Sequence, residues 1–307
     1  MRVAVIVPVY NKGPYLARCL RSIFAQRLQD FELIIVDDGS TDDSMDVATS
    51  FQDPRITLLR QSNSGPGAAR NAGIHAAQSE ICAFLDADDE WQPDYLDESV
   101  ACLESDTSLA AVVSGYIEYP RGVSTAQYWR KRGISEGVVE LCSQYSPKHL
   151  VALLAYMSCW STVARRDALL RWGGFYAAER CRYAEDAFLW LKILLNERVY
   201  FSTEPRVNFH REASELSNRG RGPRPIEPFL KHPNLIRRDC PPHLARLLEG
   251  FLTRRLVKTT CMLAYWGRWR SALALLSSWR NQTMQPLPQQ GDVLPAAETV
   301  STKDLAK

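Results

Sequence analysis

The chain has 307 residues, of which 46% are hydrophobic and 23% charged, and its net charge is +2. This composition is ordinary for a globular protein and indicates one large domain or a domain with an appendage. It excludes a disordered chain, and a membrane-spanning chain is excluded because no run approaches the ~18 consecutive apolar residues that a transmembrane helix needs.

The small net charge hides an uneven distribution. Residues 219–280 contain 13 Lys and Arg but 3 Asp and Glu, whereas residues 1–218 contain 22 basic and 29 acidic residues. A basic segment that follows an acidic region indicates an anionic partner for that segment. A solvated helix face explains the same pattern equally well.

The cysteines and the N-terminus bear on the compartment. The eight cysteines show no CxxC or CxxxC spacing, and several, such as Cys19 and Cys82, lie within apolar patterns. This favours buried thiols in a reducing compartment over disulfides or zinc ligands. No signal peptide is indicated, because Arg2 is followed at once by a strand-like run. We therefore expect a cytoplasmic protein.

The first third of the chain alternates predicted strands and helices. The strands are predicted at residues 3–9, 32–36, 56–59 and 81–85. A first helix starts near Pro14, a second follows Ser40 as its N-cap with Asp42 and Asp43 in the first turn, and a third covers residues 68–77. This alternation predicts a doubly wound parallel sheet, in which ligands bind beyond the carboxyl ends of the strands.

The remaining elements follow the same reading of apolar periodicity. Helices are predicted after Asp94 and over residues 185–195, and strands over residues 111–119 and 159–164. Residues 122–145 are predicted to be irregular. Two helices are predicted between residues 241 and 280 with a break near Gly267, and residues 283–307 have the composition of a disordered tail.

An acidic cluster follows the fourth predicted strand. Asp86, Asp88 and Asp89 come directly after an apolar run, and carboxylate oxygens suit Mg²⁺ or Mn²⁺. Such a cluster can also be a solvated turn. A second acidic pair, Asp37 and Asp38, ends a neighbouring strand, so we favour a divalent metal site at this edge of the sheet.

The pair Asp37-Asp38 has two interpretations of its own. The residues that follow can simply cap a helix, which accounts for Ser40. Capping does not account for two adjacent acids, whose carboxylates can accept hydrogen bonds from a base or a ribose. We therefore predict nucleotide recognition here.

Five ordered blocks resemble the family 2 glycosyltransferases of the GT-A fold. They are VPVYN (7–11), VDDGSTD (36–42), NSGPGAARNAG (63–73), FLDADD (84–89) and Glu185-Asp186. The resemblance covers roughly the first two-thirds of the chain. It implies a Rossmann-like, mostly parallel sheet flanked by helices, and an inverting enzyme that uses a nucleotide-sugar. The chain lacks the QxxRW motif of the processive synthases, which implies transfer of a single sugar.

The resemblance also implies residue roles. For the nucleotide, it implies contacts with Pro8, Tyr10, Asp37, Asp38, Arg70 and Asp86, with Tyr10 stacking on the base. For Mn²⁺ or Mg²⁺, it implies Asp88 as the main ligand, assisted by Asp86, and a histidine near the diphosphate or the metal, matched by His210. For the chemistry, it implies Asp186 as the base that takes the acceptor proton. An acidic pair at a helix N-terminus and a lone structural histidine are the simpler interpretations of Asp186 and His210.

The domain boundaries follow from the same comparison. Residues 1–220 are expected to form the catalytic domain, residues 221–282 a basic helical extension and residues 283–307 the tail. The expected partners are a UDP-sugar and a glycan or lipid-linked acceptor for cell-surface polysaccharide, with acceptor specificity in residues 122–160. Arginine and tryptophan on the extension favour peripheral binding to the inner face of an anionic membrane. Packing on the catalytic domain is an equal alternative, and no nucleic-acid module is present.

Two other functions fit an α/β sheet with metal-binding acids. A nucleotidyltransferase would show a glycine-rich basic loop after the first strand, and residues 9–13 do not have that character. A catalytically inactive homologue that only binds nucleotides or glycans would be expected to lack some of the acids. All of the expected acids are present.

Overall fold

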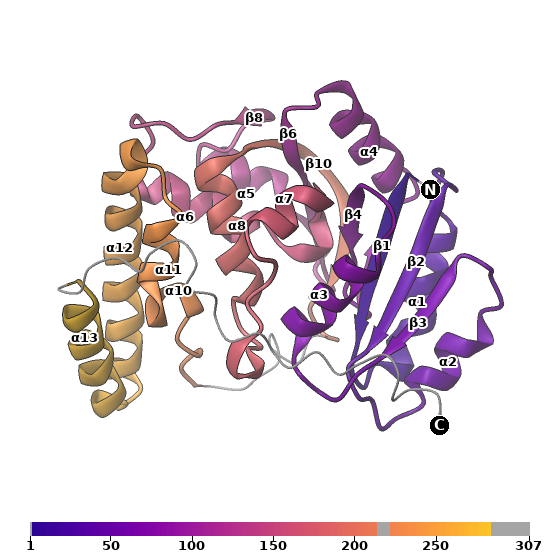
Figure 1. Cartoon of the computed structure of the whole chain (residues 1–307), viewed down its shortest axis with the longest axis horizontal. Helices are drawn as coiled ribbons and strands as arrows, with labels where there is room; N and C mark the ends of the chain where they lie inside the picture. Colours follow the sequence, from indigo (N-terminus) through magenta and orange to yellow (C-terminus); the bar gives the residue numbers. More distant parts are fainter. Residues whose placement is uncertain (1, 214–221, 284–307) are drawn as a thin grey trace.

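The computed structural model describes residues 2–213 and 222–283. A ten-stranded sheet forms its centre, in the order β3-β2-β1-β4-β9-β6-β10-β5, with β7 paired to β6 and β8 to β10. Figure 1 shows β1, β2 and β3 at one end of the molecule and the C-terminal helices at the other. The strands are β1 (Val3–Val9), β2 (Phe31–Asp37), β3 (Ile56–Arg60), β4 (Ile81–Phe84), β5 (Glu90–Trp91), β6 (Leu109–Tyr119), β7 (Val123–Ser124), β8 (Gly137–Val139), β9 (Thr162–Arg165) and β10 (Arg198–His210).

Helices cover both faces of this sheet. They are α1 (Gly13–Phe24), α2 (Ser44–Ser50), α3 (Pro66–Ala76), α4 (Tyr95–Ser105), α5 (Ala126–Lys131), α6 (Pro147–Tyr156), α7 (Arg166–Arg171), α8 (Glu185–Asn196), α10 (Pro228–Lys231), α11 (Pro233–Arg238), α12 (Ala245–Tyr265) and α13 (Trp269–Thr283). Three short 3₁₀ turns are η1 (Cys159–Ser161), η2 (Ala178–Arg180) and η3 (Pro242–Leu244).

Strand β1 shows why the first predicted strand is apolar throughout. Its alternate residues enter two different cores: Val3 and Val5 pack with α1 and α4, whereas Ala4 and Ile6 pack with α3 and α8. A strand that is covered on both faces has no solvent side on which polar residues would be stable. The predicted buried thiols Cys19 and Cys82 are also confirmed, one in each core.

The predicted α/β architecture with a C-terminal helical region is confirmed. Strands β1 to β4 pair in parallel, as does β6 with β10, whereas β9 lies antiparallel between β4 and β6. The predicted break near Gly267 separates α12 from α13. The tail beyond Thr283 lies outside the described residues.

Three details of the predicted elements are wrong. Residues 122–145, predicted to be irregular, contain β7, α5 and β8. Helix α2 begins at Ser44, and Ser40 is not its N-cap, because the polar groups of this turn bond to the loop after β1 instead. The Ser40 hydroxyl accepts from the Asn11 amide (3.1 Å), and the Asp42 carboxylate accepts from the Gly13 amide (3.0 Å). The strand predicted at residues 159–164 begins only at Thr162, because residues 159–161 form the turn η1, closed by a bond from the Ser161 amide to the Ser158 carbonyl (3.2 Å).

The C-terminal helices share a core with the rest of the chain. Phe229, Leu248 and Phe251 lie in the same buried cluster as Leu150 of α6 and Phe188 of α8. The C-terminal helices therefore pack on the rest of the chain, which is one of the two alternatives that the sequence left open.

Candidate functional site

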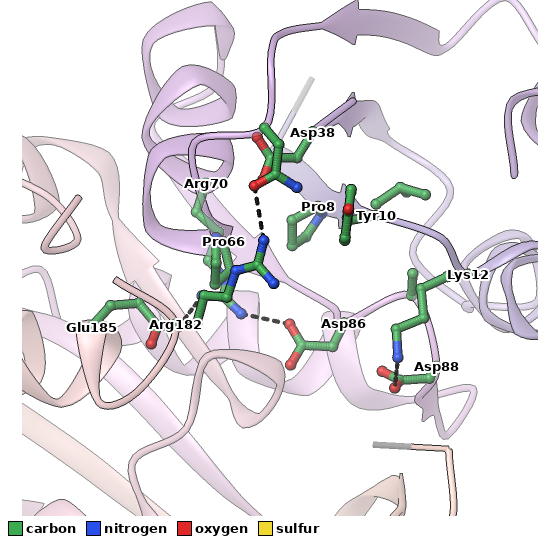
Figure 2. Close-up of a pocket in the computed structure, with 13 residues that line it drawn as sticks. Pro8, Tyr10, Lys12, Asp38, Pro66, Arg70, Asp86, Asp88, Arg182 and Glu185 are labelled. Carbon is green, nitrogen blue, oxygen red and sulfur yellow. Dashed lines mark hydrogen bonds and ion pairs between the residues drawn. The ribbon is translucent and has the colours of Figure 1, made fainter. Parts of the chain in front are cut away.

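A cavity of about 200 Å³ lies where β1, β2 and β4 end. We call it the donor cavity. The side chains that line it come from five separate segments of the chain, and Figure 2 shows how they converge. The lining residues are Pro8, Val9, Tyr10, Lys12, Asp38, Asn63, Pro66, Arg70, Asp86, Ala87, Asp88, Arg182 and Glu185. The structure therefore brings together six of the sequence-predicted residues, from Pro8 to Asp88.

Asp38 forms one wall by holding the loop before α3. Its carboxylate accepts hydrogen bonds from the Ser64 amide (2.7 Å), the Gly65 amide (2.9 Å) and the Gln61 side chain (2.8 Å). Gly65 has a φ of +92°, a conformation that glycine adopts without strain. The carboxylate thus fixes the shape of the wall that it belongs to.

Asp37 does not line the donor cavity. Its side chain is fully buried, accepts a hydrogen bond from the Ser40 amide (2.8 Å) and lies 3.1 Å from the Arg60 guanidinium. These contacts stabilise the turn that presents Asp38. The geometry gives Asp37 a supporting position beneath the site.

Arg70 links the two acidic parts of the donor cavity. Its guanidinium donates to Asp86 Oδ1 (2.7 Å) and to Glu185 Oε1 (2.8 Å), and only 5% of the side chain is exposed. Figure 2 shows the guanidinium between the two carboxylates. A buried cation in this position compensates charges that would otherwise repel each other.

Close packing brings Glu185 to Arg70. A Cβ on Gly67 would lie 2.5 Å from the Tyr176 carbonyl oxygen, so only glycine allows α3 to approach this segment so closely. Asn71 clamps the same segment, since its amide both donates to and accepts from the backbone of Phe175 at 2.8 Å. The glycine-rich block at residues 63–73 therefore positions the acids at the start of α8.

Lys12 contacts the predicted metal ligand. Its ammonium lies 2.7 Å from Asp88 Oδ2 and 3.1 Å from the Ala213 carbonyl (Figure 2). Burial raises the pKa of Asp88, and Lys12 opposes that rise. Burial and the neighbouring carboxylates of Asp88 and Asp86 also hold the pKa of Asp89 well above its usual range. The cluster is thus rich in carboxylates whose charge needs a cation.

The donor set fits a divalent metal that the substrate helps to ligate. Asp86 and Asp88 supply hard oxygen ligands at the edge of the donor cavity, and one Asp89 oxygen is buried without a hydrogen-bond partner. Across residues 2–213 and 222–283, no group of three or more His, Cys, Asp or Glu side chains is arranged to hold a metal. Mg²⁺ commonly takes one or two carboxylates and completes its shell with water and phosphate oxygens. The residues present match that pattern.

Tyr10 and Arg182 are neighbours in the lining of the donor cavity. The Arg182 guanidinium lies 5.4 Å from the centre of the Tyr10 ring and donates to Asn63 Oδ1 (3.0 Å). A cation over an aromatic face is a favourable arrangement that a planar base can also adopt. Arg182 is exposed and stacks on the ring predicted to bind the base.

His210 lies behind the acidic cluster and does not line the donor cavity. Its backbone amide donates to Asp89 (2.7 Å), and its ring nitrogens lie 2.6 Å from Glu90 and 3.0 Å from Glu212. The ring also stacks on Tyr119. Both nitrogens are engaged, so the imidazole as placed holds β10 against the cluster.

Asp186 faces a different cavity from its neighbour Glu185. It lines a larger space of about 600 Å³, which we call the second cavity, between α6, α8 and α12. Its Oδ1 accepts from the Ala187 amide (2.8 Å), and among the described residues its other oxygen has no hydrogen-bond partner. Ala184, just before the pair, has a φ of +57°, a strained conformation for alanine that fixes how the two acids diverge.

The two acids also differ in electrostatics. Burial, followed by the charge of Asp186, raises the pKa of Glu185 to about 7. Burial raises the pKa of Asp186 as well, and the positive charge of Arg70 opposes that rise. Raised carboxyl pKa values in a cleft are typical of functional sites.

Sequence reasoning missed Lys12, Arg182 and Glu185. Glu185 stood in a recognised pair, but only Asp186 was given a role. Lys12 follows the first block directly, so its place after β1 was a usable signal. Arg182 lies in a segment without strong periodicity, where no comparable signal exists.

The chain is similar to known proteins in both sequence and fold. A mixed α/β sheet with a cavity and acidic residues at the carboxyl ends of its strands has the place at which open α/β sheets bind their ligands. The family model described as Glycosyl transferase family 2 matches residues 4–170, more than half of the chain. The chain belongs to this family.

Three similar proteins show the range of the likeness. The succinoglycan biosynthesis protein ExoW of Rhizobium meliloti is 40% identical over 124 residues, 37% of this chain and 39% of that protein. TarS of S. aureus in complex with UDP-GlcNAc has a TM-score of 0.71 at 22% identity, covering 91% of this chain and 81% of that one. The mannosyltransferase PcManGT of Pyrobaculum calidifontis, in complex with GDP-Man and Mn²⁺, has a TM-score of 0.58 at 22% identity, covering 94% and 76%. The two structures share the fold.

The curated relatives are much longer than their matched parts. The alignments cover 34%, 32%, 39% and 31% of the first four relatives. No helix in residues 2–213 or 222–283 is long and apolar enough to cross a membrane.

Proposed function

We propose that this chain is an inverting glycosyltransferase that moves one sugar from a nucleotide-sugar to an acceptor hydroxyl. One observation carries the proposal: Glu185 and Asp186 are adjacent, yet they line different cavities. A donor on one side of this acidic pair and an acceptor on the other would meet at the start of α8. The bound nucleotide-sugars named for TarS and PcManGT support a nucleotide-sugar donor, and we favour UDP as its nucleotide.

Asp186 is the residue that we assign as the base. Glu185 is held by Arg70, whereas Asp186 lines the cavity in which an acceptor would bind and has one oxygen without a hydrogen-bond partner among the described residues. Asp186 would accept the proton of the acceptor hydroxyl while the hydroxyl oxygen attacks the anomeric carbon. The bond between that carbon and the nucleoside diphosphate would break in the same step. Positioning makes a weak base sufficient, because the proton moves as the new bond forms.

Asp38, Tyr10 and Pro8 are proposed to hold the base, and Arg70 and Lys12 to face the diphosphate. Mn²⁺ or Mg²⁺ held by Asp88 with Asp86 would supply charge neutralisation for the departing diphosphate. The Mn²⁺ complex of PcManGT supports a metal of this kind. His210 would then position the cluster through Asp89.

The decisive experiment replaces Asp186 by asparagine, which keeps its shape and removes its basicity. We expect transfer to fall by about 10³-fold, within the range of general-base effects, with nucleotide affinity unchanged. Glu185→Gln is the matched control and should alter donor binding. Loss of nucleotide binding in Asp186→Asn would reject the assignment.

The biological setting is proposed from the relatives. The printed role of ExoW in succinoglycan biosynthesis supports surface polysaccharide synthesis, with a glycan or lipid-linked acceptor. A screen of nucleotide-sugars for nucleotide release in the presence of Mn²⁺ would identify the donor. Absence of release with every donor would favour a binding protein instead.

We also propose that the C-terminal hairpin, which is formed by α12 and α13, binds the inner face of an anionic membrane. Helix α13 exposes Trp269, Leu273 and Leu276 at helical spacing, on a stripe about 100° around the helix from its buried Ala272 and Leu275. The exposed Arg268 and Arg270 flank this stripe. Aromatic and apolar side chains beside arginines favour an interfacial membrane contact.

A further inference from the structure

The second cavity combines an apolar half with a basic half. Leu154 from α6, Met157 just after that helix, and Phe251 and Met262 from α12 belong to the apolar part of the lining. The basic part consists of Arg224, Arg255 and Lys258. Asp186 lies at the start of α8 in the same lining, so a molecule in this space can reach both the base and the cations.

The positive charge of this lining is not balanced. The lining contains a second carboxylate besides Asp186, that of Glu227, which is already bound to Arg255 and accepts from the Thr259 hydroxyl (3.1 Å). In the described ranges, Arg224 has no hydrogen bond or ion pair and its guanidinium lies 6.0 Å from the centre of the Tyr183 ring, and Lys258 has no ion pair. Two cations therefore face the cavity without a carboxylate of their own.

The electrostatic surroundings of Lys258 agree with this arrangement. Burial lowers its pKa, the positive charges of Arg255, Arg224 and Arg132 lower it further, and Glu227 opposes the shift. Neighbouring cations that destabilise one another are relieved when an anion binds between them. A phosphate group offers up to two charges and several acceptor oxygens to such a cluster.

We infer that the acceptor carries a phosphate or diphosphate group, which Arg224 and Lys258 bind in the second cavity while an acceptor hydroxyl faces Asp186. This inference rests on the proposed function, because it assigns the second cavity to the acceptor. The phosphate can belong to a lipid-linked saccharide or to a soluble sugar phosphate. The apolar lining accommodates a hydrocarbon chain in the first case and a sugar ring in the second.

Calorimetric titration of the full chain tests the inference. The donor cavity is first saturated with UDP and Mn²⁺, and the chain is then titrated with farnesyl diphosphate, glucose 1-phosphate and, as the uncharged probe, octyl glucoside. The test variant is Arg224→Gln with Lys258→Gln. The matched control is Arg246→Gln, which removes an exposed charge from α12 outside the lining.

We expect the double variant to bind the phosphate probes at least tenfold more weakly, because each charge-assisted hydrogen bond contributes about 1.5–3 kcal/mol. Arg246→Gln should bind them like the unaltered chain. The stronger of the two phosphate probes identifies the lipid or the soluble source. Equal affinity of the double variant and the unaltered chain, absence of phosphate binding, or octyl glucoside binding as strongly as the phosphates would overturn the inference.

The design separates failure of the inference from failure of the proposed function. If neither UDP nor GDP binds the unaltered chain, the proposed function fails, and the titrations with the phosphate probes are then made without nucleotide. If UDP binds equally to the double variant and the phosphate probes are unaffected, only the acceptor inference fails. A melting temperature equal to that of Arg246→Gln confirms that the double variant is folded.

Discussion

The two cavities on either side of α8 differ in how their charges are satisfied. In the donor cavity, Asp38 accepts three hydrogen bonds, Arg70 contacts two carboxylates and Asp88 contacts Lys12. In the second cavity, Arg224 and Lys258 have no carboxylate partner in the described chain. The donor cavity is preorganised by these contacts, whereas the second cavity has positive charges that an anionic ligand could neutralise.

This difference indicates how each cavity would recognise its substrate. A wall fixed by internal hydrogen bonds can recognise the invariant part of a donor, its nucleotide, without rearrangement. Arg224 and Lys258 can be substituted without disturbing the fold, because they form no ion pair that holds other described parts of the chain in place. We therefore expect substitutions on the donor side to cost stability and those on the acceptor side to change affinity alone.

The largest effect should come from Arg70. Replacing it by methionine leaves the buried Glu185 and the partly exposed Asp86 without their counter-charge, and loss of one partner of a buried ion pair costs about 3–5 kcal/mol of unfolding free energy. Chemical denaturation measures this loss. Adding Glu185→Gln should restore part of it, since the uncompensated charge is then removed. A loss below about 1 kcal/mol, in the range of exposed ion pairs, would show that the donor side is not held by this network.

A second effect concerns pH. The pKa of Glu185 is raised in the folded chain to about 7 from an ordinary value of 4.5, so the folded state binds a proton more tightly than the unfolded state. The stability that this proton contributes is fully present below pH 4.5 and is lost as the pH rises through 7. Relative to Glu185→Gln, the unaltered chain should therefore lose on the order of 3 kcal/mol across this window.

Denaturation of both chains at several pH values between 4 and 8 measures that difference. Because Asp186 is close and also has a raised pKa, the transition belongs to the pair. Parallel stability curves for the two chains would contradict the raised pKa and the close electrostatic coupling in this part of the site.

Much of the donor side could be predicted from the sequence, because local patterns specify it. The apolar run of β1 and the acids after β4 each depend on neighbouring residues. The contact between Arg70 and Glu185 could not be predicted, since 115 positions separate the two residues along the chain. The misplaced start of α2 has a similar origin, because the Ser40 hydroxyl accepts from the distant Asn11 amide, and Asp42 accepts from the distant Gly13 amide as well as from Ser44 at the start of the helix.

The second cavity could not be predicted for a further reason. Its lining comes from α6, the start of α8, the segment before α10, and α12, and of these only the start of α8 carries a recognised block, Glu185-Asp186. The sequence indicated one basic segment after residue 219. The structure divides it, with Lys258 and Arg255 in the second cavity and Arg268 and Arg270 at the exposed hairpin. Only the packing of α12 against α6 and α8 determines this division.

A third prediction concerns two substitutions on the donor side that should change Mn²⁺ binding in opposite directions. Asp88→Ala should remove the Mn²⁺ dependence of nucleotide binding, because the principal proposed ligand is lost. Lys12→Met should increase Mn²⁺ affinity about tenfold, since the ammonium 2.7 Å from Asp88 no longer competes for that carboxylate. Titration of Mn²⁺ in the presence of UDP measures both. An unchanged titration for Asp88→Ala would reject its role as ligand, and weaker Mn²⁺ binding by Lys12→Met would show that Lys12 assists the metal.

The smallest effect is expected at the hairpin, outside both cavities. Trp269→Ser with Leu273→Ser should reduce binding to liposomes that contain anionic lipid by a few fold, because each exposed side chain contributes only its own apolar area. Stability should not change, since neither residue is buried. Leu58→Ser, an exposed leucine on the edge strand β3, is the matched control. Removing the whole segment from residue 241 would not test the same point, because α12 contributes Leu248 and Phe251 to the shared core. Undiminished liposome binding by the hairpin variant would leave the basic segment with one role, in the second cavity.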